Sequence, residues 1–261
     1  MSMMTPGAVV WFEIGTADPQ ATKDFYGSLL GWTFHAVPAA GGRIYTLISA
    51  AGAPLPMGGI WEPAQDGREA MSLSIRSADV DTDVARLGDL GARVVAPTGP
   101  AADGGRMARL TDPRGTLFSV WQAPGQPAAT PAEAGAPVPG SLGWFEIGTA
   151  DIEASKTFYA DAFGWKYVHD TGVTTKPYYA AVTPGGERGS GGLADNSAEK
   201  GAKDYAAPQF LTPDVPAAVE KAKALGAAVE HGPESTAYGL TFARLTDPRG
   251  IRFVLFSPPQ G

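Results

Sequence analysis

The first apolar stretch of the chain, VVWFEI at residues 9–14, alternates along its length. Phe12 and Ile14 fall on one side of an extended chain, while Trp11 and Glu13 fall on the other. This period of two predicts a strand with an apolar face that packs under helices and an opposite face that carries an indole and a carboxylate.

The pattern then changes to a period near four, which predicts a helix. Asp18 and Pro19 favour a helix start, because an aspartate side chain caps free amide groups and proline has no amide hydrogen to leave unpaired. Gly31 favours the end of this helix. A second helix is predicted from Val80 onward and ends at Gly91.

Short apolar stretches after each helix predict further strands. In the first half of the chain the order is a strand, a helix and three strands, and this order occurs twice. The expected strands after the first one are WTFHAV, RIYTLIS, MGGIW, MSLSI, ARVVA, RMARLT and TLFSVWQ. The second half repeats the scheme with GWFEI, WKYVH, YYAAVT, PQFLT, AAVEH, LTFARLT and IRFVLF, so the chain is expected to contain four βαβββ units.

The chain is an internal duplication. WFEIGTAD occurs at 11–18 and again at 144–151, and ARLTDPRG occurs at 108–115 and again at 243–250. A period this long indicates two domains in tandem rather than a solenoid of short repeats.

We therefore expect one domain over residues 1–122 and another over 142–261. Residues 123–141, APGQPAATPAEAGAPVPGS, are rich in proline, alanine and glycine. Such a segment has little to bury and is typical of a linker.

Composition narrows the function classes. The 261 residues carry a net charge of −7, and acids outnumber bases in both halves, so no basic surface for nucleic acid or anionic lipid is expected. There is no cysteine and no apolar run long enough to span a membrane. We expect a cytoplasmic monomer or homodimer whose partner is a small-molecule ligand, with no nucleic-acid or membrane partner.

The order of elements, the FY…GW helix and the DPRG turn before the last strand of each copy resemble the vicinal oxygen chelate superfamily. This superfamily includes glyoxalase I, extradiol dioxygenases and bleomycin-resistance proteins, and the resemblance is strongest to tandem-domain actinobacterial members. It covers nearly the whole chain. The resemblance implies an α+β fold of two tandem glyoxalase-like domains, each a pair of βαβββ units that forms a curved sheet with an open cleft. Whether the units pair within a copy or between copies stays open.

Members of this superfamily that use a metal hold it with histidine, glutamate or glutamine from four strands. Carried over onto this sequence, the first-strand position falls on Trp11 and Trp144, and the last-strand position falls on Ser119 and Val254. Indole is no metal ligand at neutral pH, serine is a poor substitute and valine is none. We therefore expect no metal and no cofactor in either cleft.

Other donors do not restore the site. The fifth-strand position is expected near residues 70–72 and 205–207, which places the nearest donor, Gln209, one step off. The chain has three histidines, and none repeats at an equivalent place: His35, His169 and His231. A single histidine at a strand end is more often a surface or packing residue than a ligand.

Strand alternation also places Arg109 on the same concave face as Glu13, and Arg244 on the face of Glu146. A buried carboxylate needs a cation or hydrogen-bond donors, because burying it unpaired costs on the order of several kcal/mol. Each pair either pins its sheet without touching a ligand, or its glutamate accepts hydrogen bonds from a ligand or acts as a general base. Pinning is favoured, because a feature kept in both copies can be a need of the shared fold.

The leading hypothesis is a metal-free protein that binds a small organic molecule with aromatic character between its curved sheets, for sequestration or resistance. The alternative is an enzyme of glyoxalase, lyase or hydroxylase type that uses a metal or a carboxylate base. In a third arrangement, one domain binds and the other is only a scaffold.

The candidate ligand-binding residues are Trp11, Glu13, Arg109, Ser119, Trp121, Trp144, Glu146, Gln209, Arg244 and Phe256. The arginines of the two DPRG turns, Arg114 and Arg249, are expected in solvent at the turn tips.

Overall fold

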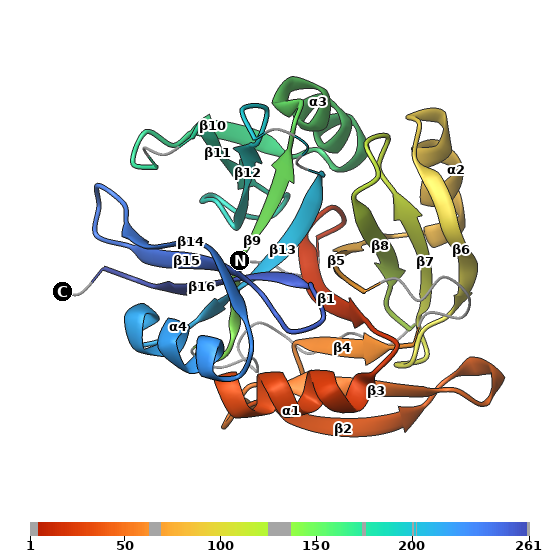
Figure 1. Ribbon diagram of the computed structural model, residues 1–261. Helices are drawn as coiled ribbons and strands as arrows, with labels where there is room; N and C mark the ends of the chain where they lie inside the picture. Colours follow the sequence, from red (N-terminus) through yellow and green to blue (C-terminus); the bar gives the residue numbers. More distant parts are fainter. Residues whose placement is uncertain are drawn as a thin grey trace.

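Two curled sheets, each with two α-helices, make up the computed structural model (Figure 1), which describes residues 5–62, 69–124, 137–173, 176–199, 201 and 203–259. Most of the expected linker, 123–141, lies outside these ranges. Within them, no helix combines the length and the apolar character needed to span a lipid bilayer.

The first domain contains β1 (Val9–Gly15), α1 (Pro19–Leu30), β2 (Thr33–Pro38), the short 3-10 helix η1 (Ala40–Gly42), β3 (Ile44–Ser49), β4 (Gly58–Trp61), β5 (Ala70–Arg76), α2 (Val80–Asp89), β6 (Arg93–Pro100), β7 (Arg106–Thr111) and β8 (Leu117–Gln122). The second domain contains β9 (Leu142–Thr149), α3 (Ile152–Phe163), β10 (Lys166–His169), β11 (Tyr178–Val182), β12 (Gly191–Asp195), β13 (Tyr205–Leu211), α4 (Val215–Ala224), β14 (Ala228–Ser235), β15 (Thr241–Thr246) and β16 (Arg252–Ser257).

The two sheets have the same topology. Their strand orders are β2-β3-β4-β1-β5-β8-β7-β6 and β10-β11-β12-β9-β13-β16-β15-β14. At the centre of each sheet the first strands of two βαβββ units pair antiparallel, β1 with β5 and β9 with β13. The units therefore pair within each copy, and the expected α+β fold of two tandem domains is confirmed.

The helix ends follow from the predicted caps. Asp18 accepts a hydrogen bond from the backbone amide of Ala21 at 3.0 Å, and Gly31 closes α1 with a φ of 69° that a residue with a side chain adopts only with strain. Asp151 and Gly164 cap α3 in the same way.

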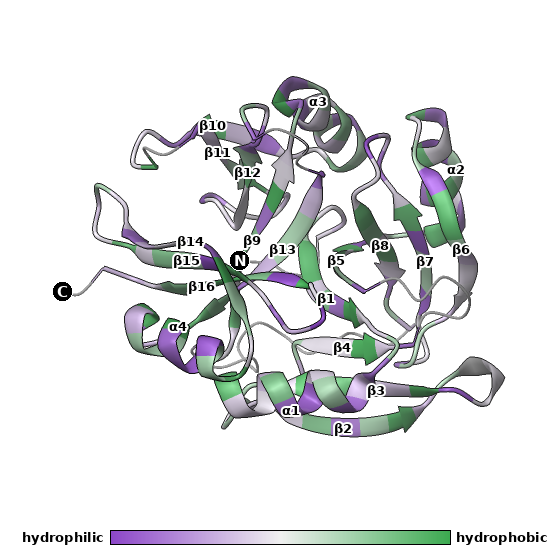
Figure 2. Ribbon diagram, viewed as in Figure 1, coloured by the Kyte–Doolittle hydropathy of each residue, from purple (hydrophilic) through white to green (hydrophobic). Residues whose placement is uncertain are grey.

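Two hydrophobic cores hold the molecule together, and each crosses from one domain to the other. One joins the second unit of the first domain to the first unit of the second, with Leu73, Val80, Leu87 and Phe118 against Phe145, Phe158 and Trp165. The other joins the outer two units, with Phe12, Ile14 and Trp32 against Phe210, Val215 and Phe253. In Figure 2 the strands mix hydrophobic and hydrophilic residues along their length, as sheets with one buried face do. Each domain thus completes the hydrophobic core of its partner domain.

The repeated FY and DPRG motifs meet across this boundary. The Tyr26 hydroxyl donates to Oδ2 of Asp247 at 3.2 Å, and the Tyr159 hydroxyl donates to Oδ2 of Asp112 at 3.0 Å. All four side chains are buried. Reciprocal bonds of this kind explain why both copies keep both motifs: each motif is half of a contact between the domains.

Candidate functional site

The carboxylate of Glu13 lies almost completely buried on the concave face of the first sheet, as strand alternation predicts. Arg109 binds it with both nitrogens, Nη2 to Oε1 at 2.8 Å and Nε to Oε2 at 3.1 Å. The Tyr45 hydroxyl donates to Oε1 at 3.0 Å, and the Ser119 hydroxyl donates to Oε2 at 3.2 Å. Each carboxylate oxygen of Glu13 therefore accepts two hydrogen bonds.

The carboxylate of Glu146 occupies the equivalent place on the second sheet, but its hydrogen bonds are distributed differently. Arg244 donates to Oε1 from Nη2 at 2.6 Å and from Nε at 3.2 Å, and Tyr205 donates to the same oxygen at 2.6 Å. Among the described residues, none donates to Oε2. Val254 stands where the first sheet has Ser119, so that donor is missing.

Electrostatics keep Glu146 ionised. Burial raises the pKa of its carboxyl, but the charge of Arg244, the Tyr205 hydrogen bond and the charge of Lys176 outweigh burial and hold that pKa below its ordinary value of 4.5. A carboxylate with a lowered pKa is a good hydrogen-bond acceptor and a weak base at neutral pH. The arrangement therefore favours recognition of a donor over proton abstraction.

Aromatic rings surround both ion pairs. The Trp11 indole donates to the Tyr45 hydroxyl at 3.0 Å, and the Trp144 indole donates to the Tyr178 hydroxyl at 2.9 Å. Trp121 and Phe256 lie further along the last strands of their sheets. Trp121 stacks with the Arg76 guanidinium at 5.1 Å, and Phe256 lies against Gly143, where an added Cβ would come within 2.6 Å of the ring.

Four aromatic side chains were missed by strand alternation alone. Tyr45 and Tyr178 repeat with the same shift as WFEIGTAD, and this repetition could have indicated them. Trp61 and Tyr205 do not repeat. Trp61, on β4, covers the Arg109 guanidinium, whose Cζ lies 4.0 Å from the centre of the ring. Tyr205, on β13, lies over Arg244, whose Cζ is 5.7 Å from the centre of the ring. The arginine of each sheet is thus flanked by an aromatic ring that comes from a different neighbouring strand.

The first-strand and last-strand positions that the resemblance assigns to metal ligands lie on the two strands that flank β5 in one sheet and β13 in the other. Trp11 is in register with Ser74, and Ser74 with Ser119. In the second sheet Trp144 is in register with Gln209, and Gln209 with Val254. Gln209 thus lies directly opposite Trp144, as Ser74 lies opposite Trp11, and the assignment of the superfamily's fifth-strand position to residues 70–72 and 205–207 stays a prediction.

These donors do not fit a divalent metal ion. The three registered positions present an indole and two hydroxyls in one sheet, and an indole, an amide and an isopropyl group in the other. Both nearby glutamates are already neutralised by arginine. Within the described ranges, no three acidic, histidine or cysteine side chains gather closely enough to hold a metal.

The histidines lie away from these positions. His35 is exposed on β2, and His169 packs against the Tyr179 ring at 5.0 Å. His231 contacts Glu234 on its own strand at 2.5 Å and stacks on Phe242.

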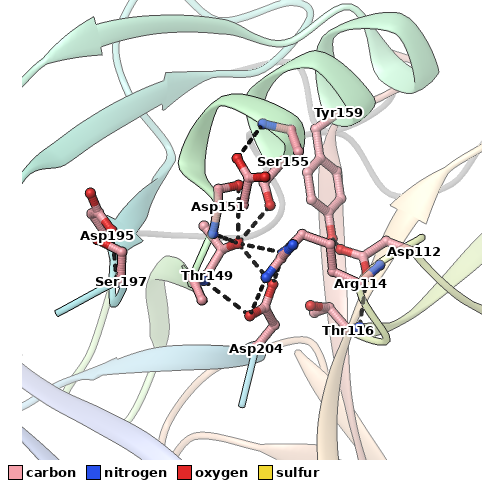
Figure 3. A network of polar contacts seen from close by, with 12 residues as sticks. Asp112, Arg114, Thr116, Thr149, Asp151, Ser155, Tyr159, Asp195, Ser197 and Asp204 are labelled. Atoms are coloured by element: carbon pink, nitrogen blue, oxygen red, sulfur yellow. Dashed lines mark hydrogen bonds and ion pairs between the residues drawn. The ribbon is translucent and has the colours of Figure 1, made fainter. Parts of the chain in front are cut away.

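The arginines of the DPRG turns keep part of their surface in solvent, as expected, but each also pairs with an acid of the other domain, which was not expected. Arg114 donates from Nε to Asp204 at 2.5 Å and to the Thr149 hydroxyl at 3.1 Å, and both partners belong to the second domain. Figure 3 shows this side chain at the centre of a polar network with Asp204 and Thr149. Arg249 pairs with Glu69 of the first domain in the reciprocal way. Because Asp204 directly precedes Tyr205, a turn of the first domain helps to position a donor to Glu146.

Comparisons with known proteins agree with this fold. Residues 10–121 match the glyoxalase-like domain model, and residues 141–255 match the model of the glyoxalase/bleomycin resistance protein/dioxygenase superfamily. The anthracycline biosynthesis protein DnrV of Streptomyces peucetius is 31% identical over 279 residues, which cover 100% of this chain and 97% of that protein. The putative glyoxylase CFP32 of Mycobacterium tuberculosis is 30% identical over 263 residues, 97% of this chain and 96% of that protein.

Solved structures share the fold at low sequence identity. The Mn(II)-bound glyoxalase from Novosphingobium aromaticivorans superposes with a TM-score of 0.61 at 20% identity, over 100% of this chain and 84% of that chain. The 2,3-dioxygenase LapB from Pseudomonas superposes with a TM-score of 0.63 at 18% identity, over 98% and 94%.

Proposed function

Because the chain belongs to the glyoxalase/bleomycin resistance protein/dioxygenase superfamily, we propose that it binds a small aromatic molecule on the concave face of its sheets without a metal ion. One observation carries the proposal. The positions that the superfamily resemblance assigns to metal ligands hold Trp11, Ser119, Trp144 and Val254, and the adjacent glutamates are paired with arginine. Such a surface binds through stacking and hydrogen bonds.

A flat, oxygenated polycyclic molecule suits this surface. Indole and phenol rings offer planar faces for stacking, and the buried ion pairs supply a few oriented polar atoms. Two curated relatives are named as anthracycline biosynthesis proteins, and anthracyclines are planar, oxygenated aromatic compounds. We infer that the protein acts in the cytoplasm and either sequesters such a compound or presents it to another reaction.

The experiment measures ligand and metal together. Full-length protein purified without chelators is titrated with a dihydroxyanthraquinone and with anthraquinone while tryptophan fluorescence is recorded, and its metal content is determined by mass spectrometry. We expect saturable quenching and no stoichiometric metal. Absence of saturable binding by both compounds, or one divalent ion per domain whose removal abolishes binding, would overturn the proposal.

A carboxylate-based enzyme is the second candidate. The observation in its favour is the Oε2 atom of Glu146, which accepts no hydrogen bond from the described residues. In this case Glu146→Gln abolishes turnover of a substrate but preserves its binding. We favour the binding function over the enzymatic one, because the lowered pKa of Glu146 makes its carboxylate a weak base.

A further inference from the structure

The two buried glutamates differ in how completely they are satisfied. In the first domain every hydrogen-bonding position of the Glu13 carboxylate is filled by Tyr45, Arg109 and Ser119. In the second domain all three donors to Glu146 converge on Oε1. The Glu146 side chain is only 6% exposed, so water cannot surround its second oxygen freely. Unlike the hydroxyls of Ser72 and Ser74, this oxygen is not one of the described side-chain atoms that are sealed from solvent without a partner.

The neighbouring positions differ in the same direction. Ser72 and Ser74 on β5 of the first domain carry unpartnered hydroxyls that are sealed from solvent, so nothing from outside reaches them. Gln209, the counterpart of Ser74, is 8% exposed and, within the described residues, makes no side-chain hydrogen bond. Its amide lies opposite Trp144 on the adjacent strand. The second face thus combines the Trp144 ring, whose N–H already donates to Tyr178, with an amide and a carboxylate oxygen that make no hydrogen bond within the described residues.

We propose that the concave face of the second domain is the recognition site, where Glu146 Oε2 accepts a hydrogen bond from a neutral hydroxyl or N–H group of the aromatic ligand. This inference rests on the proposed function and deepens it. The ligand class is a planar aromatic that carries a protonated donor, such as a phenol, because a ligand anion placed on Glu146 would be repelled by its charge. The first domain, whose carboxylate has no position left for a ligand, serves as the scaffold that completes the cores and holds Asp204, the residue before Tyr205, through Arg114.

Val254 provides the sharpest test, because the first domain shows what a hydroxyl at this position does. In Val254→Ser the new hydroxyl takes the position that Ser119 has in the first sheet. There the Ser119 hydroxyl donates to Oε2 of Glu13 at 3.2 Å. The new hydroxyl would donate to Oε2 of Glu146, the acceptor that the ligand is proposed to use. The change is small and leaves the ion pair with Arg244 in place, so the variant is expected to fold.

The experiment titrates the full-length protein with a dihydroxyanthraquinone and with anthraquinone, which lacks the hydroxyl donors. Loss of a hydrogen bond to a charged group weakens binding by about ten- to a hundredfold, so Glu146→Gln should lose this much affinity for the hydroxylated compound only. Val254→Ser should lose affinity in the same selective way, by about tenfold. Glu153→Gln, a matched charge change on an exposed pair of α3, should bind as the parent protein does.

The outcomes separate the inference from the proposed function. If both compounds bind the parent protein but Val254→Ser and a folded Glu146→Gln bind the hydroxylated one unchanged, the assignment to Glu146 is overturned and aromatic binding stands. Loss of binding in Glu13→Gln with normal binding in Glu146→Gln would move the site to the first domain and also overturn the inference. If neither compound binds the parent protein, both proposals fall.

Discussion

The concave faces of the two sheets carry the same glutamate–arginine pair and surround it differently. Around Glu13 the donors are distributed evenly over both oxygens, and the hydroxyls of β5 are sealed. Around Glu146 the donors crowd onto one oxygen. Features that both copies keep, such as the pair itself and the FY and DPRG motifs, therefore serve the common fold. Features that differ, above all Ser119 against Val254, are those on which the proposed separate tasks of the copies rest.

The largest difference should appear when each arginine is removed. Arg244→Met leaves Glu146 with Tyr205 as its remaining donor, and losing one member of a buried pair costs about 3–5 kcal/mol of unfolding free energy. Arg109→Met should cost less, because Tyr45 and Ser119 still donate to Glu13. Urea unfolding of both variants measures the two costs.

A double variant checks the physical cause. Glu146→Leu combined with Arg244→Met removes both charges, and an apolar pair of similar volume is often close to neutral in place of a buried ion pair. Recovery of most of the lost stability is expected. If the double variant is as unstable as Arg244→Met alone, the cost comes from packing and not from the unpaired carboxylate.

The contacts between domains should respond alike in both copies. Tyr159→Phe leaves Oδ2 of Asp112 without its donor, and Tyr26→Phe does the same to Asp247, so each should cost about 1.5–3 kcal/mol of unfolding free energy, the value of a hydrogen bond to a charged group. The same urea unfolding measures both. A large cost in one copy and none in the other would show that these motifs are not equivalent parts of one scaffold.

Much of this scaffold could be predicted from the chain itself. Alternation in VVWFEI separated Phe12 from Glu13, and the same rule brought Arg109 onto the carboxylate, because a strand side chain has only two directions to point. Because the chain is duplicated, each strand and helix could be predicted a second time from the sequence of the other copy. Local pattern and repetition were sufficient wherever the controlling contacts lie within one sheet.

Contacts between separate elements could not be predicted in this way. Arg114 was expected in solvent because a DPRG turn read alone ends at the surface, and its partner Asp204 lies 90 residues away in the other domain. Tyr205 depends on the register of β13 against β9, and it has no counterpart in the first copy to indicate it. Strand register is hard to predict for the same reason, because short apolar strands do not specify their alignment.

Lowering the pH should change the unfolding free energy gradually, and by less than the substitutions above. The pKa of Glu146 is held below 4.5, against the preference of burial, by Arg244, Tyr205 and Lys176, so its ionised form stabilises the fold above the unfolded pKa. That contribution is lost as pH falls through the folded value. The gap in unfolding free energy between the parent protein and Glu146→Gln should therefore narrow below pH 4.5. A gap that stays constant into strong acid would contradict an ionic role for Glu146.

The smallest effect is expected for Ser119→Ala, which makes the concave face of the first sheet more like that of the second. Ser119→Ala removes one of two donors to Oε2 of Glu13, and Nε of Arg109 still donates to that oxygen at 3.1 Å. The loss should therefore be about 1.5 kcal/mol of unfolding free energy, the lower end of the value for a hydrogen bond to a charged group. Urea unfolding measures this loss. Ser77→Ala, which removes a hydroxyl that donates to Asp83 outside the site, is the comparison.

Binding gives a second measurement. If Ser119→Ala also creates measurable binding of a hydroxylated aromatic in a protein whose Glu146 is replaced by Gln, then the Ser119 hydroxyl alone prevents the first face from binding such a ligand. If stability falls as far as in Arg109→Met, Ser119 has a packing role that its hydrogen bond does not explain.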